Sequence, residues 1–140
     1  MCITLPRNFP SQITEILGYK VVEKTRGGLY RSVFALPHAY DNTMDMHTGV
    51  AVIAKDSIHG FHAYLSLQDT LEALHNISKG SWNTYVNESD MLRIVLVQLT
   101  GDLQYESAPY PHDDIGKSQI RGFRMTILGP CPIPKDMRVR

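Results

Sequence analysis

Two histidines three residues apart, His59 and His62, are the residues whose type and spacing first suggest chemistry. Imidazole binds zinc and other divalent metals and carboxylates often complete such sites, so His112 and Asp113 would join His62 in a metal site. On a regular strand, however, successive side chains point to opposite faces, and His59 and His62 would point apart. Hydrogen-bonded histidines are therefore favoured over metal ligands, and no cofactor is predicted.

Basic and aromatic residues form a second candidate set, in two groups. Arginine forks match phosphate oxygens and aromatic faces stack on bases, so such a set would suit a small nucleotide. The alternative is that the aromatic residues pack in the core while the arginines extend to solvent. The candidate ligand-binding residues are Arg26, Tyr30, Arg31, Arg121, Phe123 and Arg124.

A strand-rich fold would position these residues. Valines and aromatics on either side of the RGG triplet predict a β-hairpin. Ser66, followed by Asp69 and by leucines at helical spacing, predicts a capped helix over about residues 67–79. A short helical turn is predicted over 11–17, ended by Gly18. The predicted class is α+β, a mostly antiparallel curved β-sheet packed on one main α-helix. The predicted strands cover residues 19–25, 29–36, 50–55, 58–65, 92–99, 103–107 and 120–128.

Length and composition indicate a single domain. The chain has 140 residues, 43% of them hydrophobic, which suits one domain over 1–128 with a proline-rich, basic arm over 129–140. Its 14 basic and 14 acidic residues balance, which argues against a long nucleic acid or an anionic membrane as partner. No apolar run reaches the roughly 18 to 20 residues of a membrane helix and no signal peptide is evident, so a cytoplasmic protein is expected. Cys2 and Cys131 are expected to be free thiols in a reducing cell, and a single bridge that joins the two ends is the alternative.

Five segments within about residues 18–128 follow one another in a characteristic order: GYKVV, GLYRSVFA, GFHAYLSLQDTLEAL, RIVLVQLTGDLQYES and KSQIRGFRMTIL. Together they resemble a class of small uncharacterised proteins encoded by phages, large DNA viruses and mobile elements. The anchor positions are Gly60, Phe61 and His62 before the capped helix, and Gly101 in a later turn. The resemblance implies a viral or phage origin and no particular activity.

An arginine in LYR, a serine in YLSLQDTLEAL and a later glutamate give a further pattern. It is similar to that of ADP-ribosyl-transferring enzymes, which use NAD. The resemblance implies dinucleotide binding by Arg31, a place for Ser66 on the strand before the helix, and a catalytic carboxylate at Glu106. One departure makes this the alternative: Ser66 suits a helix cap.

The leading prediction is a non-enzymatic binding or interaction protein. The sequence contains no Gly-x-Ser-x-Gly elbow and no glycine-rich phosphate loop, whereas a strand-rich sheet with extended termini suits contacts between chains. Such a protein would act by self-assembly, by association with a particle, or by capture of a host component such as a signalling nucleotide. A protein partner or a second copy in a homo-oligomer is expected, with a small nucleotide as candidate ligand.

Overall fold

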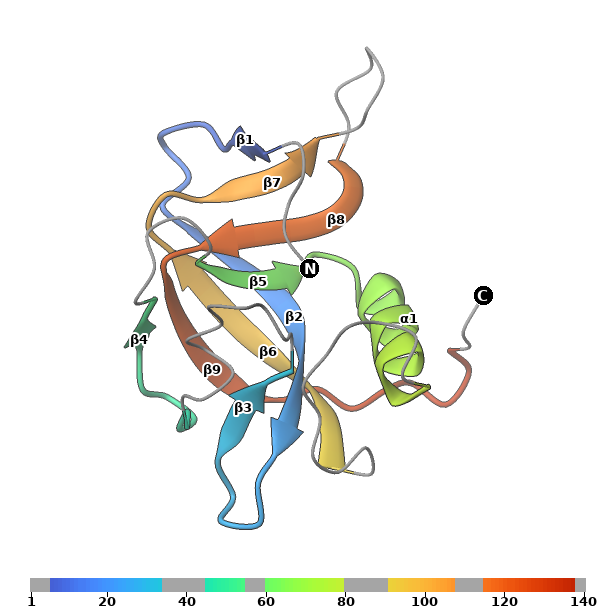
Figure 1. Ribbon diagram of the computed structural model, residues 1–140. Coiled ribbons are helices and arrows are strands. Elements are labelled where there is room, and N and C mark those ends of the chain that lie inside the picture. Colours follow the sequence, from blue (N-terminus) through green and yellow to red (C-terminus); the bar gives the residue numbers. More distant parts are fainter. Residues whose placement is uncertain (1–5, 34–44, 55–59, 80–90, 108–114, 138–140) are drawn as a thin grey trace.

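A computed structural model describes residues 6–33, 45–54, 60–79, 91–107 and 115–137 of the chain (Figure 1). Within these ranges the chain forms one helix, α1 (Leu67–Ser78), and nine strands of a single sheet. The order across the sheet is β1-β7-β8-β5-β2-β6-β9-β4, and β3 pairs with β2 beside this path. The strands are β1 (Pro6–Asn8), β2 (Glu15–Lys24), β3 (Tyr30–Ser32), β4 (Val52–Ile53), β5 (Phe61–Tyr64), β6 (Leu92–Thr100), β7 (Gln104–Ser107), β8 (Ile115–Gly122) and β9 (Arg124–Pro130).

Two bends turn the sheet back on itself. β6 continues into β7 through a turn at Gly101 and Asp102, both with positive φ, and β8 continues into β9 through Phe123. β9 pairs with β6, whereas β8 pairs with β5, and both β5 and β6 pair with β2. The strands therefore curve around a common interior, with the outline of a half-barrel (Figure 1). The prediction of a mostly antiparallel, curved sheet with one helix is confirmed.

Two hydrophobic clusters lie on the two faces of this sheet. The larger cluster combines residues of β2, β5, β6, β8 and β9, such as Val22, Phe61 and Met125, so it fills the inside of the curve. The smaller cluster includes Val21 of β2 together with Ala73 and Ile77 of α1. Neighbouring residues of β2 thus enter opposite clusters, as strand alternation requires. The described residues of the larger cluster come from the sheet and its loops, and none of them belongs to α1.

The helix has the predicted extent and start. Ser66 is its N-cap, and the Ser66 hydroxyl accepts a hydrogen bond from the backbone N–H of Asp69 at 3.2 Å, which satisfies one of the donors left open at a helix start. Asp69 in the first turn also suits the positive end of the helix dipole. No helix in the described ranges is long and apolar enough to cross a membrane.

Three sequence-based boundaries differ from the structure. The helical turn predicted over 11–17 is wrong, because β2 begins at Glu15 and Gly18 lies inside that strand. Pairing with β6, from Glu15↔Thr100 onward, supplies hydrogen bonds that outweigh the local helical pattern. β8 begins at Ile115, before the predicted start at 120, and β9 ends at Pro130, inside the segment predicted as an arm.

Gly18 permits a close approach of β2 to β5 and to a side chain of β8. A Cβ atom at this position would lie 2.8 Å from Cδ1 of Ile120 and 2.9 Å from the carbonyl oxygen of Tyr64. Both separations are shorter than van der Waals contact, and one of the two atoms belongs to the backbone. The close packing at this point of the sheet therefore depends on the absence of a side chain at Gly18.

Gly18→Ala should lower the free energy of unfolding by about 1–3 kcal/mol, the usual cost of overpacking a filled core. Chemical denaturation monitored by circular dichroism measures this difference. Gly27→Ala is the matched control, because a Cβ at Gly27 meets only the Thr25 hydroxyl at 3.9 Å. The control should stay within about 0.5 kcal/mol of the unaltered protein. Equal effects of the two substitutions would contradict the close approach.

Candidate functional site

Consecutive strand pairings place four polar residues side by side across one face of the sheet. Asn8 of β1 is opposed to Gln104 of β7. Gln104 is opposed in turn to Arg121 of β8, and Arg121 to His62 of β5. Directly opposed residues of antiparallel strands project from the same face. We call Asn8, Gln104, Arg121 and His62 the polar row.

The polar row lies on the outer face of the curved sheet. On β5, Phe61 and Ala63 enter the interior cluster, whereas Tyr64 enters the cluster that includes α1. His62 alternates with Phe61 and Ala63, so its side chain projects outward, on the side of α1. The predicted alternation along this strand is confirmed for the described residues, and His59 lies outside them.

Exposure falls along the polar row. Asn8 is exposed, Gln104 and Arg121 are half-buried, and His62 is only 8% exposed. The Nε2 group of Gln104 donates a hydrogen bond to Oδ1 of Asn8 at 2.9 Å. The Oε1 atom of Gln104 is shielded from solvent and has no hydrogen-bond partner within the described ranges. The row thus combines arginine, imidazole and amide groups on one face of the sheet.

Further polar side chains are buried on the same face. Glu106 lies two residues along β7 from Gln104, and Gln119 two residues along β8 from Arg121, so strand alternation places both on the face of the row. Gln119 is opposed to Tyr64. Burial raises the pKa of Tyr64 above its usual range, and the negative charge of Asp69 adds to this effect. The Tyr64 phenol is therefore a neutral hydrogen-bonding group at physiological pH.

Lys20 supports the row from the interior. It is opposed to Val95 of the interior cluster, so its side chain lies inside the curve, where it is 1% exposed. Its Nζ atom donates a hydrogen bond of 2.7 Å to the carbonyl oxygen of His62. β5 meets β2 at one paired position, Tyr19↔Tyr64, so this bond adds a second connection between the two strands. Lys20 thereby fixes the backbone from which the His62 side chain projects.

Lys20 should react with amine-specific reagents much more slowly than Lys79 and Lys135, because both of these are exposed. A buried amine becomes accessible only when the surrounding structure opens. Brief acetylation of the native protein followed by peptide mass spectrometry compares the three positions. In denaturant the three lysines should react at similar rates. Labelling of Lys20 at the rate of Lys79 in the native protein would contradict the burial.

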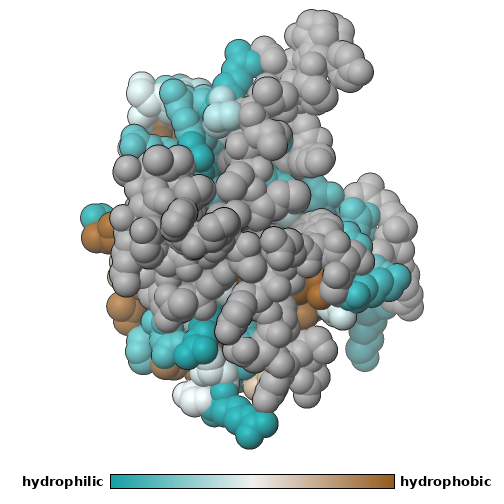
Figure 2. Space-filling model, in the orientation of Figure 1, coloured by the Kyte–Doolittle hydropathy of each residue, from teal (hydrophilic) through white to brown (hydrophobic). Residues whose placement is uncertain are grey.

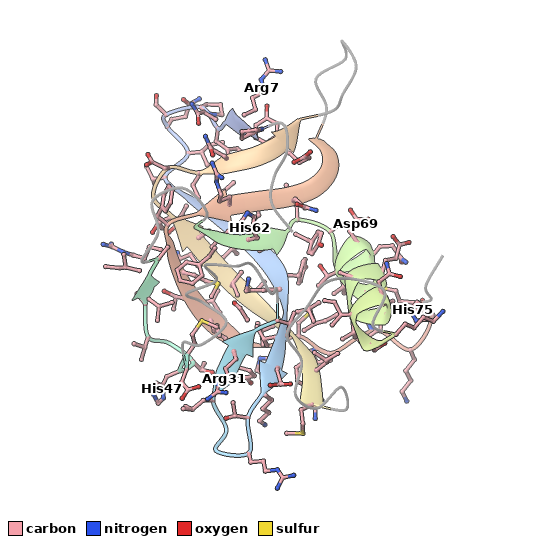
Figure 3. The ribbon with its side chains drawn as sticks, in the orientation of Figure 1. Arg7, Arg31, His47, His62, Asp69 and His75 are labelled. Carbon is pink, nitrogen blue, oxygen red and sulfur yellow. The ribbon has the colours of Figure 1, made fainter. Side chains whose placement is uncertain are left out.

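The predicted ligand-binding set divides into two separate groups. Tyr30 belongs to the interior cluster, and Arg31 and Arg26 lie on the β2–β3 hairpin. Arg121, in contrast, lies on β8, which pairs with β5 and β7 rather than with β3. Figure 3 shows Arg31 beside the labelled His47, well separated from His62. Phe123 and Arg124 follow Arg121 at the bend between β8 and β9, where the Phe123 amide donates to the carbonyl of Gly101 at 3.0 Å.

Arg31 forms an ion pair on the hairpin side of the molecule. Its Nε atom donates to Oδ1 of Asp45 at 2.6 Å, with the two side chains 37% and 44% exposed. The hydrogen bond from Arg31 is the main reason that the pKa of the Asp45 carboxyl lies below its ordinary value of 3.8. A local structural role thus accounts for the guanidinium of Arg31.

Arg31→Gln should raise the pKa of Asp45 back toward 3.8, because the hydrogen bond and the positive charge are both lost. Since the folded-state pKa is the lower one, the pair stabilises the fold above the unfolded-state value and ceases to do so as pH falls through the folded-state value. Carboxyl chemical shifts measured by NMR between acidic and neutral pH report this pKa. Arg26→Gln at the hairpin tip is the control and should leave it unchanged.

The three residues of the ADP-ribosyl-transferring alternative lie on different elements. Arg31 is on β3, Ser66 caps α1, and Glu106 is on β7, which is separated from β2 by β8 and β5. Of the predicted metal ligands, His62 is on β5, and His112 and Asp113 lie outside the described residues. Within the described ranges, no group of three or more histidine, cysteine or acidic side chains is placed to hold a metal ion. The transferase alternative stays a prediction.

Gln104 and Asn8 are the members of the row that the sequence did not indicate. The β1 segment contains Pro6, a residue that is uncommon in strands, and neither Asn8 nor Gln104 belongs to a predicted candidate set. Their place depends on the pairing of β1 with β7 and of β7 with β8, which joins distant parts of the chain. Arg121, His62 and Glu106 had each been singled out, but in three different hypotheses.

Comparisons with known proteins found no match. No protein-family model matches the chain, and neither does any curated protein or solved structure. The resemblance to proteins of phages, large DNA viruses and mobile elements therefore stays a prediction, as do the expected origin and self-assembly.

Proposed function

We propose that this chain is a non-enzymatic binding protein that captures a small nucleotide on the polar row. The observation that supports this proposal most directly is the register that places Arg121 between His62 and Gln104 on one face. A guanidinium fork can donate several hydrogen bonds to phosphate or ring acceptors, and imidazole can add another. Arg121, from the predicted ligand-binding set, is the central residue of the site.

The burial of the row supports binding of a small molecule rather than of an extended surface. His62 is 8% exposed and Glu106 8%, whereas Asn8 at the sheet edge is open to solvent. A ligand would approach from the exposed end and replace water at partly buried polar groups, where hydrogen bonds are stronger than in bulk solvent. The carboxylate of Glu106 limits the positive charge of the site, so a ligand of modest charge fits better than a polyanion.

The composition of the row favours binding over covalent chemistry. Asn8, Gln104, Arg121 and His62 include no hydroxyl or thiol nucleophile, and the proposal takes the imidazole of His62 and the neighbouring carboxylate of Glu106 as binding groups. Lys20, the nearby amine, lies on the opposite face with its Nζ bonded to a backbone carbonyl. On this proposal the ligand is released unchanged.

Titration calorimetry of the full chain with AMP, CMP, GMP, UMP and ribose 5-phosphate tests the proposal. At least one nucleotide should bind, and chromatography after overnight incubation should recover it intact. Absence of heat with every nucleotide at millimolar concentration would overturn the proposal. Conversion of the bound nucleotide into another compound would overturn its non-enzymatic part.

Arg121→Gln should weaken nucleotide binding by at least about tenfold, the cost of a lost charge-assisted hydrogen bond. Arg26→Gln, which removes an exposed arginine of the hairpin, is the matched control and should bind as the unaltered protein does. Arg121→Lys keeps the charge but loses the planar fork, so an intermediate loss is expected. Thermal unfolding of each variant verifies that it is folded. Unchanged affinity in both Arg121 variants would contradict the site.

A further inference from the structure

A strip of apolar side chains lies on the outer face of β2, β6 and β9. On β2, Leu17 and Tyr19 share the face of Val21, which belongs to the cluster that includes α1. Tyr19 is opposed to Leu96 of β6, and Leu96 lies beside Leu128 at the irregular point of the β6–β9 pairing. Leu17, Tyr19, Leu96 and Leu128 are therefore contiguous, and we call them the outer strip.

The outer strip is open to solvent at both ends. Leu17 is 55% exposed, and Leu128, which follows Ile127 of the interior cluster, is 44% exposed. α1 cannot cover the whole face, because its 12 residues span about 18 Å, whereas the 10 residues of β2 span about 33 Å. Figure 2 shows further hydrophobic side chains at the left margin of the molecule, where β4, the neighbour of β9, lies in Figure 1. Contiguous exposed apolar surface is typical of a contact with another chain.

Opposite charges flank the outer strip on the two sides of β6. Thr100 of β6 is opposed to Glu15 of β2 on one side and to Arg124 of β9 on the other, so the three side chains project from one face. Glu15 and Arg124 are both exposed, and they lie two strand spacings apart, about 10 Å. The Nε2 group of Gln98 donates to Oε2 of Glu15 at 2.5 Å, which holds the carboxylate on this face. A face with an acid on one side and a base on the other is complementary to a copy of itself.

We infer that the outer strip is the contact between two copies of this chain. With a two-fold axis along β6, β2 of each copy lies over β9 of the other, in the manner of two sheets packed face to face. Glu15 of each copy then meets Arg124 of the other. Tyr19 meets Leu128 in the same way, so every contact occurs twice. The formal charge of the chain is zero, so two copies approach without net repulsion.

The inference is independent of the proposed function, because the polar row lies on other strands, β1, β7, β8 and β5. Nucleotide binding and self-association can therefore fail separately. A variant of the outer strip leaves the side chains of the polar row unaltered.

Sedimentation velocity of the full chain across micromolar concentrations measures the association. The unaltered protein should sediment as a dimer at the highest concentrations and shift toward the monomer on dilution. Leu17→Asp should weaken association by at least about tenfold, because it places a charge in an apolar contact. Val50→Asp is the matched control, since Val50 is 53% exposed but lies before β4, outside the outer strip, and this variant should associate as the unaltered protein does. A strict monomer of the unaltered protein would overturn the inference and leave the outer strip to a partner of another kind.

Charge reversal tests the pairing of Glu15 with Arg124 between copies. Glu15→Arg and Arg124→Glu should each weaken association by at least about tenfold, because each variant sets like charges opposite one another. A mixture of the two variants should associate at least about tenfold more tightly than either variant alone, since every reversed residue then meets an opposite charge. Damage to the fold of a single chain would give no such recovery. If the unaltered protein dimerises but the mixture associates no better than the separate variants, the inference is overturned.

Discussion

The amine of Lys20 lies inside the curved sheet, where it donates a hydrogen bond to the carbonyl of His62. The apolar side chains of the interior pack around this buried polar interaction. Withdrawing an amine from water is costly unless its hydrogen-bonding needs are met, so the position of β5 relative to β2 is constrained by this bond. Gly18, two residues before Lys20, lets the same two strands pack closely, since a Cβ there would lie 2.9 Å from the carbonyl oxygen of Tyr64. The steric requirement at Gly18 and the hydrogen-bonding requirement at Lys20 thus act on neighbouring positions of the same strand pair.

The hydrogen bond between Lys20 and the backbone of β5 also affects the outer face of the sheet. Because β5 is held by Lys20 on the inside, His62 projects outward from a fixed backbone, beside Arg121 and in line with Gln104. Neighbouring strands of a sheet lie at a regular distance from one another. Residues from β1, β7, β8 and β5 therefore form one continuous row, although they are distant in the sequence. The outer face thereby gains a polar surface on one part of the sheet, while α1 and its hydrophobic cluster occupy another.

Local patterns identified much of the fold. The capping arrangement of Ser66 and Asp69 located α1, and the glycines after Arg26 located the β2–β3 turn, in which Gly28 has positive φ. Local patterns could not predict the long-range pairing. The segment from Glu15 has helical spacing, but pairing with β6 makes it a strand. The site was predictable only in pieces, because Arg121 and His62 are chemically conspicuous, whereas the amide of Gln104 acquires its importance from a register that no local pattern encodes.

The bent connections from β6 to β7 and from β8 to β9 also affect how the chain can fold during synthesis. β2 is made early, but its principal partner β6 begins only at Leu92, and the strands that close the curve follow later still. Until then the apolar side chains and open edges of β2 lack their native neighbours, a situation that favours association with other chains. Such non-local pairing also slows folding, because distant segments must meet before either gains stability. The growing polypeptide is therefore most prone to association with other chains after β2 has been synthesised and before β6 is available to pair with it.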